Sequence, residues 1–319
     1  MRSRLTRLVS QALVLGLGLA LASRAVAVDG VIEINTAKAL AGGVTTGDTP
    51  GFPVTISESG SYRLTGNLTV GGGDPSITSA IVVSASLNVT IDLNGFTILG
   101  PTNCTGIPVT MCMPAGTAMG IDASARQAVT IRNGIIRGFP DRGINTGPDA
   151  LIENVVVSSN GLNGIQVGNG SVVRSCRATQ NGNDGIAGSA VVVFEGNSSD
   201  ANGGVGVRTS VSSVVSNTTA SSNGTSGFVV FAGSNLRGNT ATLNHGQGYG
   251  AAGACLLIGN TATGNTDVGM TLGPGSGFAQ NVLTNNNGGD ANAQVNGSGT
   301  DLGGNICGVA GMGNGVACP

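Results

Sequence analysis

The sequence predicts an all-β protein, a right-handed parallel β-helix whose coils are about 21 residues long. Three observations lead to this prediction. Short β-rich segments are separated by Asn-Gly turns, which supply the positive φ that tight corners need. Columns of apolar side chains alternate with columns of polar ones. Glycines recur 21 residues apart, each followed by an apolar residue, at Gly143, Gly164, Gly185, Gly206, Gly227, Gly248 and Gly269.

One apolar column indicates which side chains face inward. It runs through Ile131, Ile152, Val173, Phe194, Val215, Leu236, Leu257 and Phe278. The next residue in each repeat is polar for most of the chain, at Arg132, Glu153, Arg174, Glu195, Ser216 and Arg237. This is the period-2 pattern of a strand with one buried face. A leucine framework, a hexapeptide period and the calcium-binding nonapeptide pattern are missing, so the right-handed parallel β-helix is the architecture that remains.

Asparagine follows the same period and predicts ladders of hydrogen bonds from coil to coil. One series is Asn160, Asn181, Asn202, Asn223, Asn244, Asn265 and Asn286. A second keeps the period to within one or two residues, at Asn154, Cys176, Asn197, Asn217, Asn239, Asn260 and Asn281. Stacked amides at a corner can pass hydrogen bonds along the stack and satisfy turn backbone. We therefore interpret them as structural rather than as ligand contacts.

The chain divides into four regions. Residues 1–27 read as a signal peptide, in which Arg2, Arg4 and Arg7 precede an apolar run and the small-residue site Ala25-Val26-Ala27. The apolar run is too short and too early for a membrane span, so we expect a secreted or periplasmic bacterial protein. The other regions are an N-terminal cap segment at 28–79, coils at 80–290 with an insertion at 101–117, and a Gly/Asn-rich tail at 291–319.

The charge balance argues against nucleic acid as a partner. The chain has 14 basic and 16 acidic residues, and the signal peptide holds four arginines. The mature chain would therefore keep 10 basic residues, a net charge near −6. An acidic surface disfavours nucleic acid or an anionic membrane.

The six cysteines predict two local disulfides and two free thiols. Cys104 and Cys112 flank the short insertion, and Cys307 and Cys318 flank the tail, so we expect pairing within each couple. Cys176 and Cys255 lie about four coils apart on different columns. At about 4.8 Å per coil they would be roughly 19 Å apart, whereas a bridge needs Cα atoms within about 7 Å. We expect both to be buried and free.

Two stretches of the N-terminal half carry a family resemblance. DTPGFPVTISESGSYRLTGNLTV (48–70) and NVTIDLNGFTILG (88–100) resemble the opening of secreted bacterial right-handed β-helix repeat proteins of the pectate-lyase-like superfamily. The following Gly-Ile and Asn-Gly coils resemble its repeats, so the resemblance covers most of residues 45–290. It implies the same fold. Relatives include polysaccharide lyases, galacturonan hydrolases and epimerases, together with members that have no known activity.

The catalytic residues of these relatives have no clear counterpart here. The hydrolases use three aspartates beside a histidine, and this chain has no such Asp-Asp pair and a single His, His245. Lyases use aspartates to hold calcium and an Arg or Lys to abstract a proton. If there is an active site, its candidates are Glu153, Arg174, Arg177, Glu195 and Asp200. Glu195 or Asp200 would be the acid or cation ligand, and Arg174 or Arg177 would bind a uronate.

A structural interpretation of the same charges is favoured. Arg132, Glu153, Arg174 and Glu195 alternate in sign in one column, which avoids repulsion between stacked coils. A further column, Ser158, Thr179, Asp200, Ser221, Thr242, Thr263 and Thr284, is nearly a row of hydroxyls, a surface that ice-binding solenoids present. Aromatic residues that could stack on a glycan are few, because the chain has nine, and Phe194, Phe228, Tyr249 and Phe278 fall on inward columns.

These patterns rank three functions. The first is an exported, non-catalytic scaffold or a surface protein that binds an extracellular polymer such as a polysaccharide. The second is a polysaccharide-active enzyme, a uronate lyase rather than a glycoside hydrolase. An ice-binding solenoid is a remote third. We expect no cofactor and no metal, with calcium only in the case of a lyase.

Overall fold

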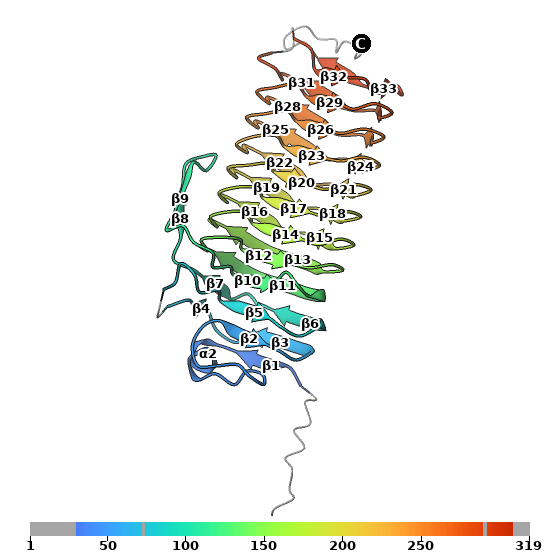
Figure 1. Cartoon of the computed structure of the whole chain (residues 1–319). Helices are drawn as coiled ribbons and strands as arrows, with labels where there is room; N and C mark the ends of the chain where they lie inside the picture. Colours follow the sequence, from blue (N-terminus) through green and yellow to red (C-terminus); the bar gives the residue numbers. More distant parts are fainter. Residues whose placement is uncertain (1–29, 72–73, 290–291, 309–319) are drawn as a thin grey trace, which may run out of the picture. The chain divides into compact units, whose positions relative to one another are not determined.

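The structure, a computed structural model, describes residues 30–71, 74–289 and 292–308. Its helix and strands lie in a unit that begins at Ile32, where the chain winds into stacked coils (Figure 1). Strands of successive coils pair in parallel, and equivalent residues are 21 positions apart through most of the stack. The predicted fold class is confirmed. The predicted signal peptide lies outside the described residues.

Each regular coil contributes one strand to each of three stacks. Stack 1 consists of β1 (Ile32–Ile34), β3 (Gly60–Leu64), β6 (Leu87–Asp92), β11 (Gln127–Arg137), β13 (Leu151–Ser158), β15 (Val172–Arg174), β18 (Val193–Glu195), β21 (Val214–Ser216), β24 (Asn235–Arg237), β27 (Leu256–Ile258), β30 (Gly277–Ala279) and β33 (Thr300–Asp301).

Stack 2 follows stack 1 along each coil, and the long strands β11 and β13 belong to both. Its other strands are β4 (Leu68–Thr69), β7 (Thr97–Leu99), β16 (Arg177–Thr179), β19 (Ser198–Asp200), β22 (Thr219–Ser221), β25 (Thr240–Thr242), β28 (Thr261–Thr263), β31 (Val282–Thr284) and β34 (Ile306–Gly308).

Stack 3 completes the coil and forms a separate 11-stranded sheet. It contains β2 (Val54–Ile56), β5 (Ile81–Val83), β10 (Ile121–Ala123), β12 (Ile144–Thr146), β14 (Ile165–Val167), β17 (Ile186–Gly188), β20 (Val207–Arg208), β23 (Phe228–Val230), β26 (Tyr249–Ala251), β29 (Met270–Leu272) and β32 (Val295–Gly297).

The core consists of side chains stacked in columns. Ile152 lies in register with Val173, which lies in register with Phe194, and all three are fully buried. In stack 3 the rings of Phe228 and Tyr249 stack with their centroids 4.9 Å apart. Each such buried side chain contributes about 1.5–3 kcal/mol. The inward column predicted from the sequence is therefore confirmed.

Two buried asparagine ladders bind the coils together. In the first, the side chain of Asn223 donates through Nδ2 to Asn244 Oδ1 at 2.9 Å and to the Ser199 carbonyl at 3.1 Å. Its Oδ1 accepts from Nδ2 of Asn202 at 3.0 Å and from the Asn202 backbone N–H. The ladder runs from Asn160 to Asn286, and Gln294 takes the next position. Every amide is thereby satisfied without water, as burial requires.

The second ladder differs from the prediction at two positions. Cys176 N–H donates to Asn197 Oδ1 at 2.9 Å, and Thr218, not Asn217, continues the column between Asn197 and Asn239. From Asn239 the ladder proceeds through Asn260 and Asn281 to Asn305. The assignment of Asn154 and Asn217 to this ladder was wrong, because both side chains are exposed.

Asn154 and Asn217 lie instead at a corner of the coil. Asn154 and Asn217 have φ values of 54° and 51°, and Ser175 at the equivalent position has 53°. This left-handed conformation is one that asparagine tolerates better than most residues. The same conformation recurs at the other two corners of the coil, for example at Gln180 and Val191. Asn154 and Asn217 therefore turn the chain from stack 1 to stack 2.

An antiparallel hairpin, the arm, interrupts the coils between stack 2 and stack 3. It comprises β8 (Asn103–Thr105) and β9 (Met111–Met113), and the Cys104–Cys112 disulfide that the sequence predicted joins its strands. The arm follows the neighbouring coils (Figure 1), and its Val109 N–H donates to the Ala201 carbonyl at 3.2 Å.

The remaining cysteines agree with the predictions where the structure describes them. Cys176 and Cys255 are buried free thiols, and burial raises the pKa of the Cys176 thiol to about 12. Cys307 is disulfide-bonded. Its predicted partner, Cys318, lies outside the described residues.

The stacking begins before the predicted start of the coils at residue 80. Ile32, Tyr62, Ile91 and Ile131 lie in one column, although the chain between them is longer than 21 residues. These longer connections hide the period in the sequence. The short helix α2 (Thr36–Ala41) begins at Asn35, whose side chain accepts from Lys38 N–H at 3.0 Å. Across the described ranges we find no helix with the length and apolar character of a membrane span.

The first ladder makes a prediction about stability. Asn223→Ala removes one rung and leaves the groups of Asn202, Asn244 and Ser199 buried without their partner. We expect a loss of about 1–3 kcal/mol, measured by chemical denaturation. The matched control is Asn235→Ala on an exposed strand position, which should change stability by less than about 0.5 kcal/mol. Equal losses for both variants would contradict the structural role of the ladder.

Candidate functional site

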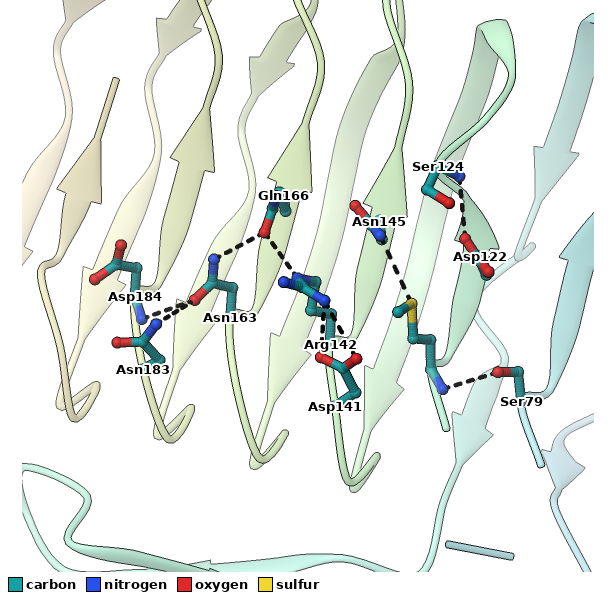
Figure 2. Close-up of polar contacts among 11 residues, drawn as sticks. Ser79, Asp122, Ser124, Asp141, Arg142, Asn145, Asn163, Gln166, Asn183 and Asp184 are labelled. Atoms are coloured by element: carbon teal, nitrogen blue, oxygen red, sulfur yellow. Dashed lines mark hydrogen bonds and ion pairs between the residues drawn. The ribbon is translucent and has the colours of Figure 1, made fainter. Parts of the chain in front are cut away.

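The outward face of stack 3 carries a polar network that extends over several coils. The middle residue of each strand points outward here, so Asp122, Asn145, Gln166, Ala187 and Arg208 lie in register from β10 to β20. The turns that lead into these strands add Asp141, Arg142, Asn163, Asn183 and Asp184. Figure 2 shows how most of these side chains meet across successive coils.

Arg142 is the centre of this network. Its Nη1 donates to both carboxylate oxygens of Asp141, at 3.0 and 3.2 Å, and its Nε donates to Gln166 Oε1 at 2.7 Å. The same Gln166 oxygen accepts from Asn163 Nδ2 at 3.1 Å (Figure 2). Because Arg142 and Gln166 come from adjacent coils, these bonds fix one coil against the next. The Arg142 side chain remains about one quarter exposed.

The network continues to a second acid–guanidinium pair. Asn163 Oδ1 accepts from Asn183 Nδ2 at 2.9 Å and from Asp184 N–H at 3.2 Å. Asp184, almost fully buried, accepts from Arg208 Nε at 2.6 Å and from Val205 N–H at 2.8 Å. Each guanidinium thus faces its own carboxylate. Linked hydrogen bonds of this kind hold side chains in one arrangement.

The carboxyl group of Asp141 has a raised pKa. Burial disfavours its charged form and raises the pKa. The guanidinium of Arg142 acts in the opposite direction, and the nearby carboxylate of Asp122 raises the pKa further. A carboxyl group with this property can hold or deliver a proton more readily than an ordinary aspartate.

A shallow hollow of about 400 Å³ lies at the other edge of the same face. Asn145 and Gln166 line it, together with Gly147, Gly168 and Ser189, which occupy equivalent positions in three successive coils. Both glycines allow a close approach of the coils, because a Cβ on Gly147 or Gly168 would lie 2.4–2.5 Å from backbone atoms of the preceding coil. The hollow therefore presents amide groups beside bare backbone.

In the structure, the five catalytic candidates predicted from the sequence lie on two different faces. Glu153, Arg174 and Glu195 lie in register on the outside of stack 1. Arg174 Nη2 contacts Glu153 Oε2 at 2.6 Å. Arg177 and Asp200 lie on stack 2, beyond the corner, where Asp200 accepts from Ser221 Oγ at 2.7 Å. The five candidates therefore do not lie on one face.

The stack 1 charges form a ladder that is longer than expected. Its seven members alternate in sign and lie in register: Glu33, Arg63, Asp92, Arg132, Glu153, Arg174 and Glu195. Arg132 Nε approaches Asp92 Oδ2 at 3.3 Å. Half of the Arg174 side chain is exposed, and exposed pairs contribute about 0–1 kcal/mol each. This geometry suits a structural ladder.

The hydroxyl column of stack 2 is in register as the sequence predicted. Ser158, Thr179, Asp200 and Ser221 stack in order, followed by Thr242, Thr263 and Thr284. Ice binding by this face stays a prediction, which a thermal-hysteresis measurement tests. Among the described residues, no three His, Cys, Asp or Glu side chains converge as metal ligands would.

Sequence reasoning missed the stack 3 network, although the repeat contained a signal for it. The column Arg142, Asn163, Asp184 and the column Asn145, Gln166, Ala187, Arg208 both keep the 21-residue step. Hydrogen bonds join residues 24 positions apart, Arg142 with Gln166 and Asp184 with Arg208. A search for polar columns shifted by three residues would have found the network.

The comparisons with known proteins agree with this architecture. Residues 119–266 match the family described as right handed beta helix region. The mannuronan C-5 epimerase AlgE4 A-module of Azotobacter vinelandii is similar in structure, with a TM-score of 0.53 and 14% identity over 81% of this chain and 73% of that one. No protein of curated function matches the chain in sequence.

Two further solved structures have the same fold. A mutant of the periplasmic alginate epimerase AlgG has a TM-score of 0.52 and 15% identity over 78% of this chain and 77% of its own. The Dettilon tailspike protein gp208 has a TM-score of 0.51 and 13% identity over 81% of this chain and 62% of its own. The chain thus has the right-handed parallel β-helix fold, which the family match supports over residues 119–266 and these solved structures share.

The pKa of Asp141 provides a test of the site geometry. In a carbon-13 NMR titration we expect its midpoint above the usual value of about 3.9. Asp122→Asn removes a negative neighbour and should lower the pKa of Asp141, whereas Arg142→Gln removes a positive one and should raise it. A pKa that neither substitution moves would contradict the placement of Asp122 and Arg142 near the Asp141 carboxyl group.

The raised pKa of Asp141 also determines how the stability of the folded protein changes with pH. The folded state holds the Asp141 proton more tightly than the unfolded state does. Stability from this group therefore falls as pH rises from the ordinary value to the raised one. Asp141→Asn removes this loss of stability. The melting temperature of the variant, relative to that of wild type, should therefore rise as pH increases from the ordinary pKa of aspartate to the raised one.

The charge ladder makes a contrasting prediction. Glu153→Gln should lower stability by less than about 1 kcal/mol, and the difference should shrink as salt is added, because ions screen exposed charges. Thermal melting at low and high ionic strength measures both effects. A large loss that is independent of salt would show that the ladder is more than a surface arrangement.

Proposed function

We propose that this chain is an exported β-helix scaffold that binds an extended polysaccharide along the outward face of stack 3. The observation that carries the proposal is the network from Asp141 to Arg208, together with the hollow beside it. Amide, carboxylate and guanidinium groups are held in fixed positions on one open face, and such groups complement the hydroxyls and carboxylates of sugars.

The geometry of the coils suits a polymer more than a small ligand. Successive coils rise by about 4.8 Å, so the same face offers a new set of polar groups at each step along the stack. Asn145 and Gln166 repeat this arrangement on adjacent strands. The hollow is open rather than enclosed. An extended chain could therefore lie across several coils and contact each of them.

The structural neighbours support a polysaccharide as the partner. Two of them are described as epimerases of mannuronan and of alginate, and the second is described as periplasmic. An exported location for this chain agrees with that description and with the leader expected at residues 1–27. Acidic polymers are the natural first choice for a binding panel, because Arg142 and Arg208 are both partly exposed.

A second candidate function is a polysaccharide lyase at the same network. The observation that favours it is the raised pKa of Asp141 beside the guanidinium of Arg142. In such a reaction Arg142 would hold a uronate carboxylate, and Asp141 would exchange a proton with the sugar.

Binding measurements test the first proposal. We expect wild-type protein to bind at least one polymer of a panel containing polymannuronate, polygalacturonate and a neutral glucan, by calorimetry. Gln166→Ala removes the oxygen shared by Arg142 and Asn163 and should weaken that binding by about tenfold, or about 1.4 kcal/mol. Thr242→Ala on stack 2 is the matched control and should leave the affinity unchanged.

The outcomes separate the two functions. Failure of all polymers to bind, or equal effects of Gln166→Ala and Thr242→Ala, would contradict the binding face on stack 3. Release of unsaturated sugar ends by wild-type protein, lost in Asp141→Asn, would replace the scaffold with the lyase. Retention of polymer without any release is the result that the scaffold predicts.

A further inference from the structure

One aromatic side chain lies apart from all the others. The chain has seven Phe, two Tyr and no Trp, and all nine aromatic residues fall in the described part of the chain. Phe231 is the only one of them that is exposed, with 44% of its surface accessible. Phe194, Phe228 and Tyr249 are fully buried in the core. An exposed Phe forgoes the burial that stabilises the rest.

The position of Phe231 places it on the stack 3 face. It follows directly after β23, whose Val229 lies in register with Arg208 on the outward side. Because side chains alternate along a strand, residue 231 points to the same side as Val229. The Ser234 hydroxyl and the Cys255 thiol, at the turn from stack 3 to stack 1, both donate to the Phe231 carbonyl, at 2.6 and 3.3 Å.

Phe231 also continues the column that lines the hollow. At steps of 21 residues this column is Gly147, Gly168, Ser189, Ser210 and Phe231. The first three members line the hollow, and Ser210 is small. Four coils at about 4.8 Å place Phe231 roughly 19 Å from Gly147 along the stack. The column from Gly147 to Phe231, here called the track, therefore consists of small residues with one large aromatic ring at its far end.

The chemistry of the track changes along its length. Near Gly147 and Gly168 the adjacent side chains are Asn145 and Gln166, which offer hydrogen bonds. In the coil that precedes Phe231, the apolar side chain of Val211 is 41% exposed. A pyranose ring presents hydroxyls at its rim and C–H groups on its faces, so it can use both environments. Aromatic rings bind such C–H faces by burial of apolar area.

We propose that Phe231 is a stacking platform for one sugar unit of a polysaccharide whose preceding units occupy the hollow. This inference rests on the proposed function, because it assigns a subsite to the same polymer. The ligand class is an oligosaccharide long enough to reach from Gly147 to Phe231. Shorter sugars fill the hollow alone and make no contact with the ring.

The absence of tryptophan from the sequence allows a direct test. Phe231→Trp introduces a single fluorescent reporter and conserves the platform. We expect a hexasaccharide of the bound polymer to change its emission at saturation, whereas a disaccharide should leave the emission unchanged. Hexasaccharide binding by calorimetry with no change in emission would overturn the platform.

Affinity measurements complete the test. Phe231→Ala should weaken hexasaccharide binding by about tenfold and leave disaccharide binding unchanged. Leu243→Ala is the control, because Leu243 is 60% exposed directly after the stack 2 strand β25, and it should bind both sugars as wild type does. If wild type binds the polymer and Phe231→Ala binds the hexasaccharide equally well, the platform fails and the proposed function stands. If wild type binds no polymer, the proposed function fails first.

Discussion

The in-register stacking of coils is the constraint on which the rest of the structure depends. Backbone pairing alone would allow a coil to slip, since register is specified by which side chains are buried rather than by the backbone bonds. The buried amides remove that freedom. Asn202, Asn223 and Asn244 each need an oxygen of the next coil within hydrogen-bond distance. A shift of one residue would leave buried polar groups without partners, at a cost of about 1–3 kcal/mol each.

Fixed register gives each face of the coil a different character. Stack 1 carries the alternating charges, of which Glu153 and Arg174 form the closest pair. Stack 2 carries hydroxyls in a column that includes Thr242 and Thr263. Stack 3 carries the amide and guanidinium network and the hollow. Only stack 3 combines hydrogen-bonding groups, a recess and an exposed aromatic ring, and for this reason we place the polymer there.

The sequence predicted the fold because its information is periodic. The column from Ile131 to Phe278 and the pairing of Cys104 with Cys112 followed from spacing alone, and the structure confirms both. The errors arose where residue type was weighed above spacing. Asn154 and Asn217 were chosen as asparagines, whereas the strict step leads to Val155 and Thr218. The start of the coils was missed because the first connections are longer than 21 residues.

The candidate site was less accessible from the sequence than the fold. Its bonds join residues of adjacent coils at a separation of 24, such as Arg142 and Gln166. Its hollow is lined by Gly147 and Gly168, and glycine is common throughout the chain. The prominence of Glu153 and Arg174 in the sequence reflects a regular surface ladder. The ladder alternates two charges in a single column, whereas the network joins two columns whose residue types change from coil to coil.

Hydrogen exchange of asparagine side-chain amides tests the stacked register most directly. In NMR spectra of the folded protein, the Nδ2 hydrogens of Asn202, Asn223 and Asn244 should exchange far more slowly than those of the exposed Asn235. Each buried amide donates to the next coil, so its exchange requires the coils to separate. Equal and rapid exchange at all four residues would contradict the ladder, and with it the columns that form the three faces.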